Sequence, residues 1–219
     1  MTLFRLDASI RTQGSVSRAV ADTVQAAWQA EHPDARIVRR DLASDLLPAS
    51  TWATAVSAGM TPAEERTPAQ HGAVAMASSL ADELLAADAY LFAIPLYNYA
   101  IPHHVKSWID TLLTTPAFGP GATPAVAGRP AVLVTVRGGG YGPGTPREGW
   151  DHNTPYLRRV FADMWNLDLE IVEAELTLAE VNPAMAELRP LAAESLEAAH
   201  LSAAETGRTL AARLSTPAA

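Results

Sequence analysis

The sequence predicts an α/β fold in which a parallel five-stranded sheet carries helices on both faces, giving three layers. Apolar, strand-like runs alternate five times with segments of helical periodicity, and such alternation is typical of parallel strands joined by crossover helices. Two of the runs are continuously apolar, as expected of strands buried on both faces. No internal repeat, low-complexity tract or linker interrupts the pattern, so residues 1–219 are predicted to form a single domain.

Three strands and two helices are expected in the first half of the chain. Two of the strands are short, mostly apolar runs and the one at 35–41 is apolar only at its centre, at Ile37 and Val38, whereas the first helix has apolar residues three or four positions apart. Ser15 precedes the first helical pattern, and Thr67 with Pro68 precedes the second, which is typical of helix starts. In chain order, these elements are predicted at residues 2–6 (strand), from 15 to the break at Pro33 (helix), 35–41 (strand), 67–87 (helix) and 89–94 (strand), with an irregular, proline-containing stretch at 42–66.

The second half is expected to hold two further strands. Residues 102–113 form an amphipathic helix with one apolar stripe, and a connection rich in Gly and Pro leads to the continuous apolar strand 131–136. The remaining elements are a glycine-rich loop at 137–144, a helix that begins at Thr154, a strand at 167–174 and a helical region at 182–214. Five strands fit the flavodoxin-like order 2-1-3-4-5 better than the six-stranded dinucleotide-binding sheet.

The composition argues against several classes of protein. The chain has no cysteine, which excludes disulfides, thiolate metal sites and a catalytic thiol. Its net charge of −8 argues against sequence-independent binding of nucleic acid, which needs an excess of Lys and Arg. No run of about 20 apolar residues is present, and the N-terminus becomes charged too early for a signal peptide. We therefore expect a cytoplasmic protein with no nucleic-acid or membrane partner.

Three loops are candidates for a ligand site, because ligands of such sheets bind at the carboxyl ends of the strands beside the point where strand order reverses. The first, residues 7–17, places Ser9, Ser15 and Ser17 around the start of a helix. Free N–H groups and the helix dipole favour a phosphate there, although Ser15 could equally be only a helix cap. The loop lacks the Gly-Lys-Ser/Thr ending of a Walker motif.

The other two loops suit the edge of a flat ring. Tyr97, Asn98 and Tyr99 lie between two prolines, and they could form a stiff wall beside a heterocycle or simply an ordinary turn with exposed tyrosines. The glycines of residues 137–144 do not have the spacing of a dinucleotide-binding loop. They favour a close approach of the backbone to a ligand, although a mobile loop has the same composition.

Two other patterns are weaker. His103 and His104 are adjacent on a helix and therefore point in different directions, so no metal site is expected. Ser15 is not part of a nucleophile elbow, so no side-chain nucleophile is expected either. The aromatic residues Trp52, Phe118 and Phe161 are interpreted as core residues or as parts of a substrate lid.

Taken together, the loops resemble the FMN-dependent NADH azoreductase family, whose members are also described as NADH:quinone oxidoreductases with a flavodoxin-like fold. The matching segments occur in the family's order and spacing between about residues 2 and 175. They are Ser9 with Ser15-Val16-Ser17, residues 95–99, residues 106–110, Arg137-Gly138-Gly139, and residues 154–157.

The resemblance implies FMN as the cofactor and NADH or NADPH as the electron donor. It also implies which residues hold the flavin: Ser9, Ser15, Val16 and Ser17 at the phosphate, Leu96, Tyr97, Asn98 and Tyr99 at the isoalloxazine, and Val136, Arg137, Gly138 and Gly139 at its other edge. The family usually carries Met at the position of Leu96 and often His at that of Tyr141, so Tyr141 is a candidate substrate contact.

The implied activity is a ping-pong, two-electron (hydride) transfer through flavin N5 from a nicotinamide to a quinone or azo compound. Family members are typically homodimers with a shared active site, so the candidate substrate contacts Phe118 or Phe161 could come from the partner; Trp52 is a further candidate. Two alternatives remain open. One is a flavodoxin-type electron carrier, and the other is a tailoring enzyme of the same fold with another acceptor or phosphate ligand.

Overall fold

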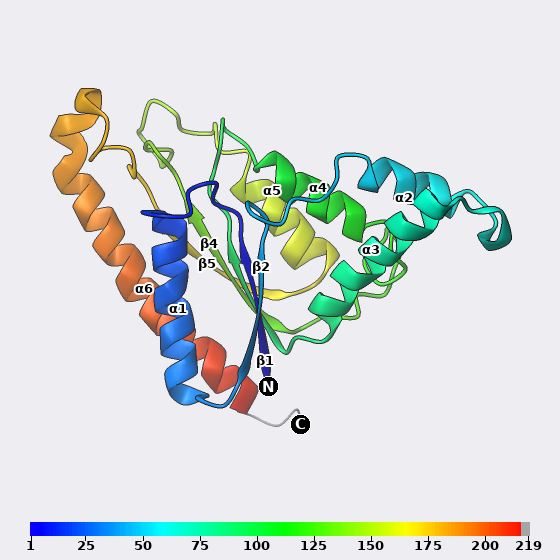
Figure 1. The fold of residues 1–219 in the computed structure, drawn as a ribbon. Coiled ribbons are helices and arrows are strands. Elements are labelled where there is room, and N and C mark those ends of the chain that lie inside the picture. Colours follow the sequence, from blue (N-terminus) through cyan, green and yellow to red (C-terminus); the bar gives the residue numbers. More distant parts are fainter. Residues whose placement is uncertain (216–219) are drawn as a thin grey trace.

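A five-stranded sheet runs through the middle of the computed structural model, which describes residues 1–215 (Figure 1). All neighbouring strands are parallel, and their order β2-β1-β3-β4-β5 confirms the predicted flavodoxin-like sheet. The strands are β1 (Thr2–Asp7), β2 (Arg36–Asp41), β3 (Ala89–Ala93), β4 (Pro130–Val136) and β5 (Asp168–Ala174). The prediction of one domain over residues 1–219 extends beyond the described part and stays a prediction.

Helices cover both faces of the sheet (Figure 1). One face is covered by α1 (Val16–Glu31) and α6 (Arg189–Ser215), and the other by α2 (Thr51–Gly59), α3 (Pro68–Leu85), α4 (His103–Leu112) and α5 (Thr154–Arg158). A π-helical segment, Arg159–Met164, continues α5, and short 3-10 helices occupy Ala63–Glu65 and Pro183–Leu188. Among the helices of residues 1–215, none has the combination of length and apolarity that a membrane crossing needs.

The predicted boundaries agree with the structure to within a few residues, with one difference in the stretch 42–66. This stretch was expected to be irregular because of its prolines, but it contains α2. Pro48 and Pro62 lie outside that helix, and the segment between them is rich in Ala, which has the highest helix propensity. Prolines that flank a short helix thus look, in the sequence, like prolines that prevent one.

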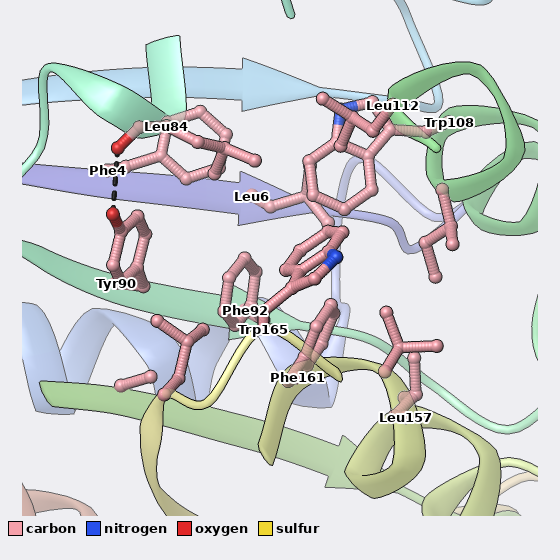
Figure 2. Close-up of a cluster of buried hydrophobic side chains, with 14 of the residues drawn as sticks. Phe4, Leu6, Leu84, Tyr90, Phe92, Trp108, Leu112, Leu157, Phe161 and Trp165 are labelled. Atoms are coloured by element: carbon pink, nitrogen blue, oxygen red, sulfur yellow. Dashed lines mark hydrogen bonds between the residues drawn. The ribbon is translucent and has the colours of Figure 1, made fainter. Parts of the chain in front are cut away.

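The face of the sheet under α3, α4 and α5 carries an aromatic core (Figure 2). Phe92 of β3 stacks on Phe161 with 4.3 Å between ring centroids, and Trp165 lies at the edge of Trp108. The hydroxyl of Tyr90 donates to the carbonyl oxygen of Leu84 at 2.7 Å, so this polar group is paired although it is buried. The core packs β1 and β3 against α3, α4 and α5.

On the opposite face of the sheet, α6 lies directly against α1 (Figure 1). Gly207 of α6 is at the point of closest approach. A Cβ atom at this position would lie 2.5 Å from the carbonyl oxygen of Val24 and 2.8 Å from the Cβ of Ala27. Because a backbone atom cannot move aside as a flexible side chain can, only glycine allows this helix crossing.

We predict that Gly207→Ala lowers the free energy of unfolding by about 1–3 kcal/mol, the usual effect of overpacking a close contact. Urea denaturation followed by circular dichroism measures the change. Gly72→Ala is the matched control, because Gly72 is an exposed glycine inside α3 and an added Cβ there would meet no other part of the described chain within 4 Å, the neighbouring backbone of its own helix apart. That variant should gain about 0.5–1 kcal/mol. Equal stability of Gly207→Ala and wild type would contradict the close crossing.

Candidate functional site

A cavity of about 830 Å³ opens where the chain leaves the carboxyl ends of β1, β3 and β4, a size typical of small-molecule sites. It is lined by the three loops expected at the carboxyl ends of the strands, residues 7–17, 95–102 and 137–149, together with His103 and His104 of α4 and with Thr177 and Leu178. Of the described residues that line it, none carries a carboxylate, whereas Arg11 and Arg147 do line it. The cavity is therefore a cationic region in a chain whose net charge is −8.

The loops meet because the backbone hydrogen bonds of the sheet continue past the strands. The N–H of Ala8 donates to the carbonyl oxygen of Ala93 at 3.0 Å, and that of Leu96 donates to Val136 at 2.9 Å. The N–H of Arg137 likewise donates to Ala174 at 2.8 Å. Each loop thus begins beside its neighbour, so residues far apart in the sequence face one space.

Side chains from other elements hold the beginning of the first loop. The Nε2 atom of His104 donates to the carbonyl oxygen of Ala8 at 2.8 Å. The hydroxyl of Tyr97 accepts from the N–H of Ile10 at 3.1 Å and lies 3.4 Å from the hydroxyl of Ser9. The Tyr97 side chain therefore bridges two of the loops, a role that its position in the sequence did not indicate.

The start of α1 presents polar groups to the cavity. Ser15 is the N-cap and its hydroxyl accepts from the N–H of Arg18 at 3.4 Å, so it both caps the helix and lines the cavity. The hydroxyl of Ser17 lies 3.2 Å from that of Ser15. The N–H groups of Val16 and Ser17 belong to the first turn and have no acceptor within the helix, which makes them suitable donors to an anion.

Residues 97–100 form a tight hairpin turn at the cavity wall. Tyr97 and Ala100 exchange two backbone hydrogen bonds of 3.0 Å each. Asn98 and Tyr99 between them have φ angles of 48° and 70°, as in a type I′ turn. Asn adopts this left-handed region readily, but for Tyr it costs about 1 kcal/mol. Such strain is typical of functional sites. In this turn, Asn98 and Tyr99 both line the cavity.

Glycines allow neighbouring side chains to approach the third loop. A Cβ at Gly138 would lie 2.6 Å from Leu178 Cδ1, and one at Gly139 would lie 2.5 Å from Arg147 Nη1. Both contacts are to ends of flexible side chains. The bare backbone at Gly138 and Gly139 is thus covered by Leu178 and Arg147, which sequence reasoning did not identify as site residues.

Arg137 fixes this loop rather than lining the cavity. Its guanidinium donates to Asp151 at 2.8 Å, to Glu173 at 2.6 Å and to Glu175 at 3.3 Å. Burial alone would raise the pKa of Asp151, but hydrogen bonds from Thr154 and the charge of Arg137 lower that pKa below its usual value. Arg137 therefore joins the end of β4 to β5 and to the far end of the loop.

Three aromatic rings gather beside the cavity: Tyr99 and Tyr141 line it, and Trp150 contacts Tyr99. The ring centroids of Tyr99 and Trp150 are 5.5 Å apart, and those of Tyr99 and Tyr141 are 6.4 Å apart, both in edge-to-face contact. The N–H of His152 donates to the carbonyl oxygen of Tyr99 at 2.9 Å. Trp150 is half-exposed. Sequence reasoning missed Trp150, although it is the one tryptophan in a polar loop rich in Gly and Pro.

The structure gathers most of the predicted site residues in one place. All residues expected at the cofactor line the cavity except Arg137, and Tyr141 lines it as well. Phe118 and Phe161 do not; they are 3% and 0% exposed and belong to the aromatic core, in which Figure 2 shows Phe161. Trp52 lies on α2 outside the cavity. Of the two interpretations of Phe118 and Phe161, core or lid, their positions favour the core.

Comparison with known proteins agrees with this geometry. A family model described as "Flavodoxin-like fold" matches residues 1–198. The FMN-dependent NADH:quinone oxidoreductase of Parafrankia sp. (strain EAN1pec) is 39% identical, over 96% of this chain and 98% of that relative. A protein of the same name from Streptomyces avermitilis is 41% identical, over 97% of this chain and 98% of the relative.

Two solved structures are similar in fold. An azoreductase from Bacillus anthracis str. Sterne has a TM-score of 0.78 and 21% identity, covering 95% of this chain and 99% of that chain. An FMN-dependent NADH-azoreductase from Bacillus anthracis str. Ames Ancestor, in complex with FMN, has a TM-score of 0.75 and 19% identity, covering 96% and 99%. At these identities the two structures support the fold alone.

We predict that stability falls as the pH drops below about 6.5 and that His104 is a main cause. Burial lowers the pKa of His104 from 6.5, more than its hydrogen bond to Ala8 opposes the change. The unfolded chain therefore takes up a proton first as the pH falls, which favours unfolding. Asp41 and Asp151, whose pKa values are also lowered, contribute in the same direction only at more acidic pH.

Urea midpoints measured between pH 7.5 and pH 5.5 test this prediction. His104→Gln keeps a side-chain amide that can donate to the carbonyl of Ala8 but cannot take up a proton. The variant should show a clearly smaller loss of stability over this range than wild type. An unchanged loss would show that His104 is not the responsible group.

Proposed function

The chain belongs to the FMN-dependent NADH:quinone oxidoreductases of flavodoxin-like fold, and we propose that the cavity at the carboxyl edge of its sheet is where FMN is held. NADH and a quinone or azo acceptor would use the same cavity in turn. The observation that carries this proposal is that three loops converge on one cavity. Arg11 and Arg147 line this cavity, and among the described residues that line it none carries a carboxylate.

The residues that line the cavity fit FMN. The phosphate suits the first-turn N–H groups of Val16 and Ser17 together with the hydroxyls of Ser9, Ser15 and Ser17, because these are donors close to a helix N-terminus. The flat ring suits the hairpin turn at Asn98 and the bare backbone at Gly138 and Gly139. FMN, when bound, supplies the redox chemistry by accepting two electrons from NADH and passing them to the acceptor.

The protein's own contribution is position and charge. We assign the phosphate anchor to Ser9, Ser15, Val16 and Ser17, and the ring contacts to Leu96–Tyr99 side chains and to the backbone at Val136, Arg137, Gly138 and Gly139. The guanidinium groups of Arg11 and Arg147 line the same cavity and would attract the diphosphate of NADH as well. No side chain has to act as a nucleophile in this scheme.

The aromatic residues beside the cavity are the proposed contacts for the acceptor. Tyr99, Tyr141 and Trp150 present large rings beside the space in which the flavin would lie. Quinones and azo compounds are flat and electron-poor, so stacking or edge contacts with these rings favour their binding. Trp52, Phe118 and Phe161 are not included, because within this chain they lie outside the cavity.

A homodimer with a shared active site is also proposed. It is supported by an exposed apolar stripe along α2 and its C-cap residue Met60, where Trp52, Val56 and Met60 are spaced four residues apart and are 41–79% exposed. A cytoplasmic location is proposed as well, since the donor NADH is a metabolite of the cell interior.

Steady-state kinetics of the purified protein test the function. With FMN, NADH and a water-soluble benzoquinone, NADH should be oxidised at a rate that depends on all three, and double-reciprocal plots at several quinone concentrations should be parallel, as expected of two half-reactions. Negligible turnover by FMN-loaded protein would instead favour a flavodoxin-type electron carrier. Failure of the apoprotein to quench FMN fluorescence would overturn the cofactor site.

A further inference from the structure

Arg18, in the first turn of α1, contacts the first loop without lining the cavity, and all three of its guanidinium nitrogens donate hydrogen bonds. Nη2 donates to the carbonyl oxygen of Ser9 at 2.8 Å, and Nε donates to that of Arg11 at 3.2 Å. Nη1 and Nη2 donate to the two carboxylate oxygens of Asp41 at 2.6 and 2.8 Å. One side chain thus connects the loop, α1 and the end of β2.

The carboxylates around Arg18 keep it in this orientation. Asp41 is the last residue of β2 and binds Arg18 in bidentate geometry, which is specific in direction as well as strong. Asp7 at the end of β1 is fully buried and lies 3.9 Å from Arg18, while it also pairs with Arg5 and Arg39. The hydrogen bond from Arg18 lowers the pKa of Asp41, so this pair remains ionised at neutral pH.

The contacts of Arg18 determine which way the peptide groups of the loop point. In a trans peptide, the C=O and the following N–H point in opposite directions. The Ser9 carbonyl faces Arg18, and the N–H of Ile10 on the other side of that peptide meets the Tyr97 hydroxyl. The Arg11 carbonyl also faces Arg18. Both carbonyl oxygens are therefore held toward Arg18, which does not line the cavity, and the loop backbone is fixed in this conformation.

We propose that Arg18, oriented by Asp41, is a positioning residue that sets the affinity of the first loop for the phosphate of FMN. The inference rests on the proposed function, in which this loop and the start of α1 hold that phosphate. Arg18 does not line the cavity, so it acts through the loop backbone and through Ser15, whose hydroxyl accepts from the Arg18 N–H. It is not a catalytic residue.

The test compares FMN with riboflavin, which has the same ring without the phosphate. The full-length apoprotein is titrated with each, and flavin fluorescence reports binding. Arg18→Lys keeps the positive charge but cannot make the bidentate bond and reach two carbonyls at once. We expect the Kd for FMN to rise about tenfold or more, the effect of losing hydrogen bonds to a charged group. The Kd for riboflavin, which has no phosphate to lose contact with, should change by less than about twofold.

Arg40→Lys is the matched control. Arg40 precedes Asp41 on β2 and is similarly buried, with a side chain 13% exposed against 10% for Arg18. It pairs with Glu83 and Asp45 instead of the loop. Both flavins should bind this variant as they bind wild type. Asp41→Asn, which loses the charge that orients Arg18, should lower the preference for FMN in the same direction as Arg18→Lys.

The outcomes separate this inference from the proposed function. If wild type binds FMN no more tightly than riboflavin, the phosphate site of the proposed function fails. If wild type prefers FMN and Arg18→Lys keeps that preference, the role of Arg18 alone fails. Equal weakening of both flavins would mean that Arg18 only stabilises the fold, which also overturns the inference. Should Arg18→Lys not fold, the ratio measured for Asp41→Asn decides.

Discussion

The parallel pairing of β1, β3 and β4 is the constraint on which the rest of the structure depends. Side chains on the two faces of these strands differ in size. Phe4, Tyr90 and Phe92 face the helices α3 to α5, whereas Leu3, Ala89 and Leu91 face α1 and α6. Because a slip of one residue would turn the aromatic rings toward the face covered by α1 and α6, where these smaller side chains now pack, the register is fixed. That register brings residues 8, 96 and 137 to one edge.

The site built on this edge combines a rigid base with local strain. Arg18 donates hydrogen bonds to the first loop and forms ion pairs with Asp41 and Asp7, and the ion pair of Arg137 with Asp151 fixes the third loop. The hairpin turn at Asn98 and Tyr99 is kept in left-handed conformations by its two backbone bonds and by the N–H of His152. Charged pairs of this kind contribute more to orientation than to net stability. The positive charge of the cavity itself comes from Arg11 and Arg147, which line it in a chain of net charge −8.

Much of the fold could be predicted from the sequence, because continuous apolar runs and helical spacing report burial directly. The positions of the three loops followed from strand order alone. Other features depend on partners far away in the chain. Arg137 sits among the glycines, yet Glu173 and Glu175 engage its side chain, and nothing local indicates them. An aromatic residue such as Phe161 is equally compatible with a core and with a lid, and only packing decides. The helix α2 was missed because its flanking prolines resemble helix breakers.

Amide chemical shifts of the ¹⁵N-labelled apoprotein during titration with FMN test most directly whether the three loops form one site. Shifts should change together in residues 9–17, 96–100 and 138–141 and should saturate with a single Kd. The amides of α2, which lies outside the cavity, should change little. Changes confined to one loop, or different Kd values for different loops, would contradict a common site for FMN.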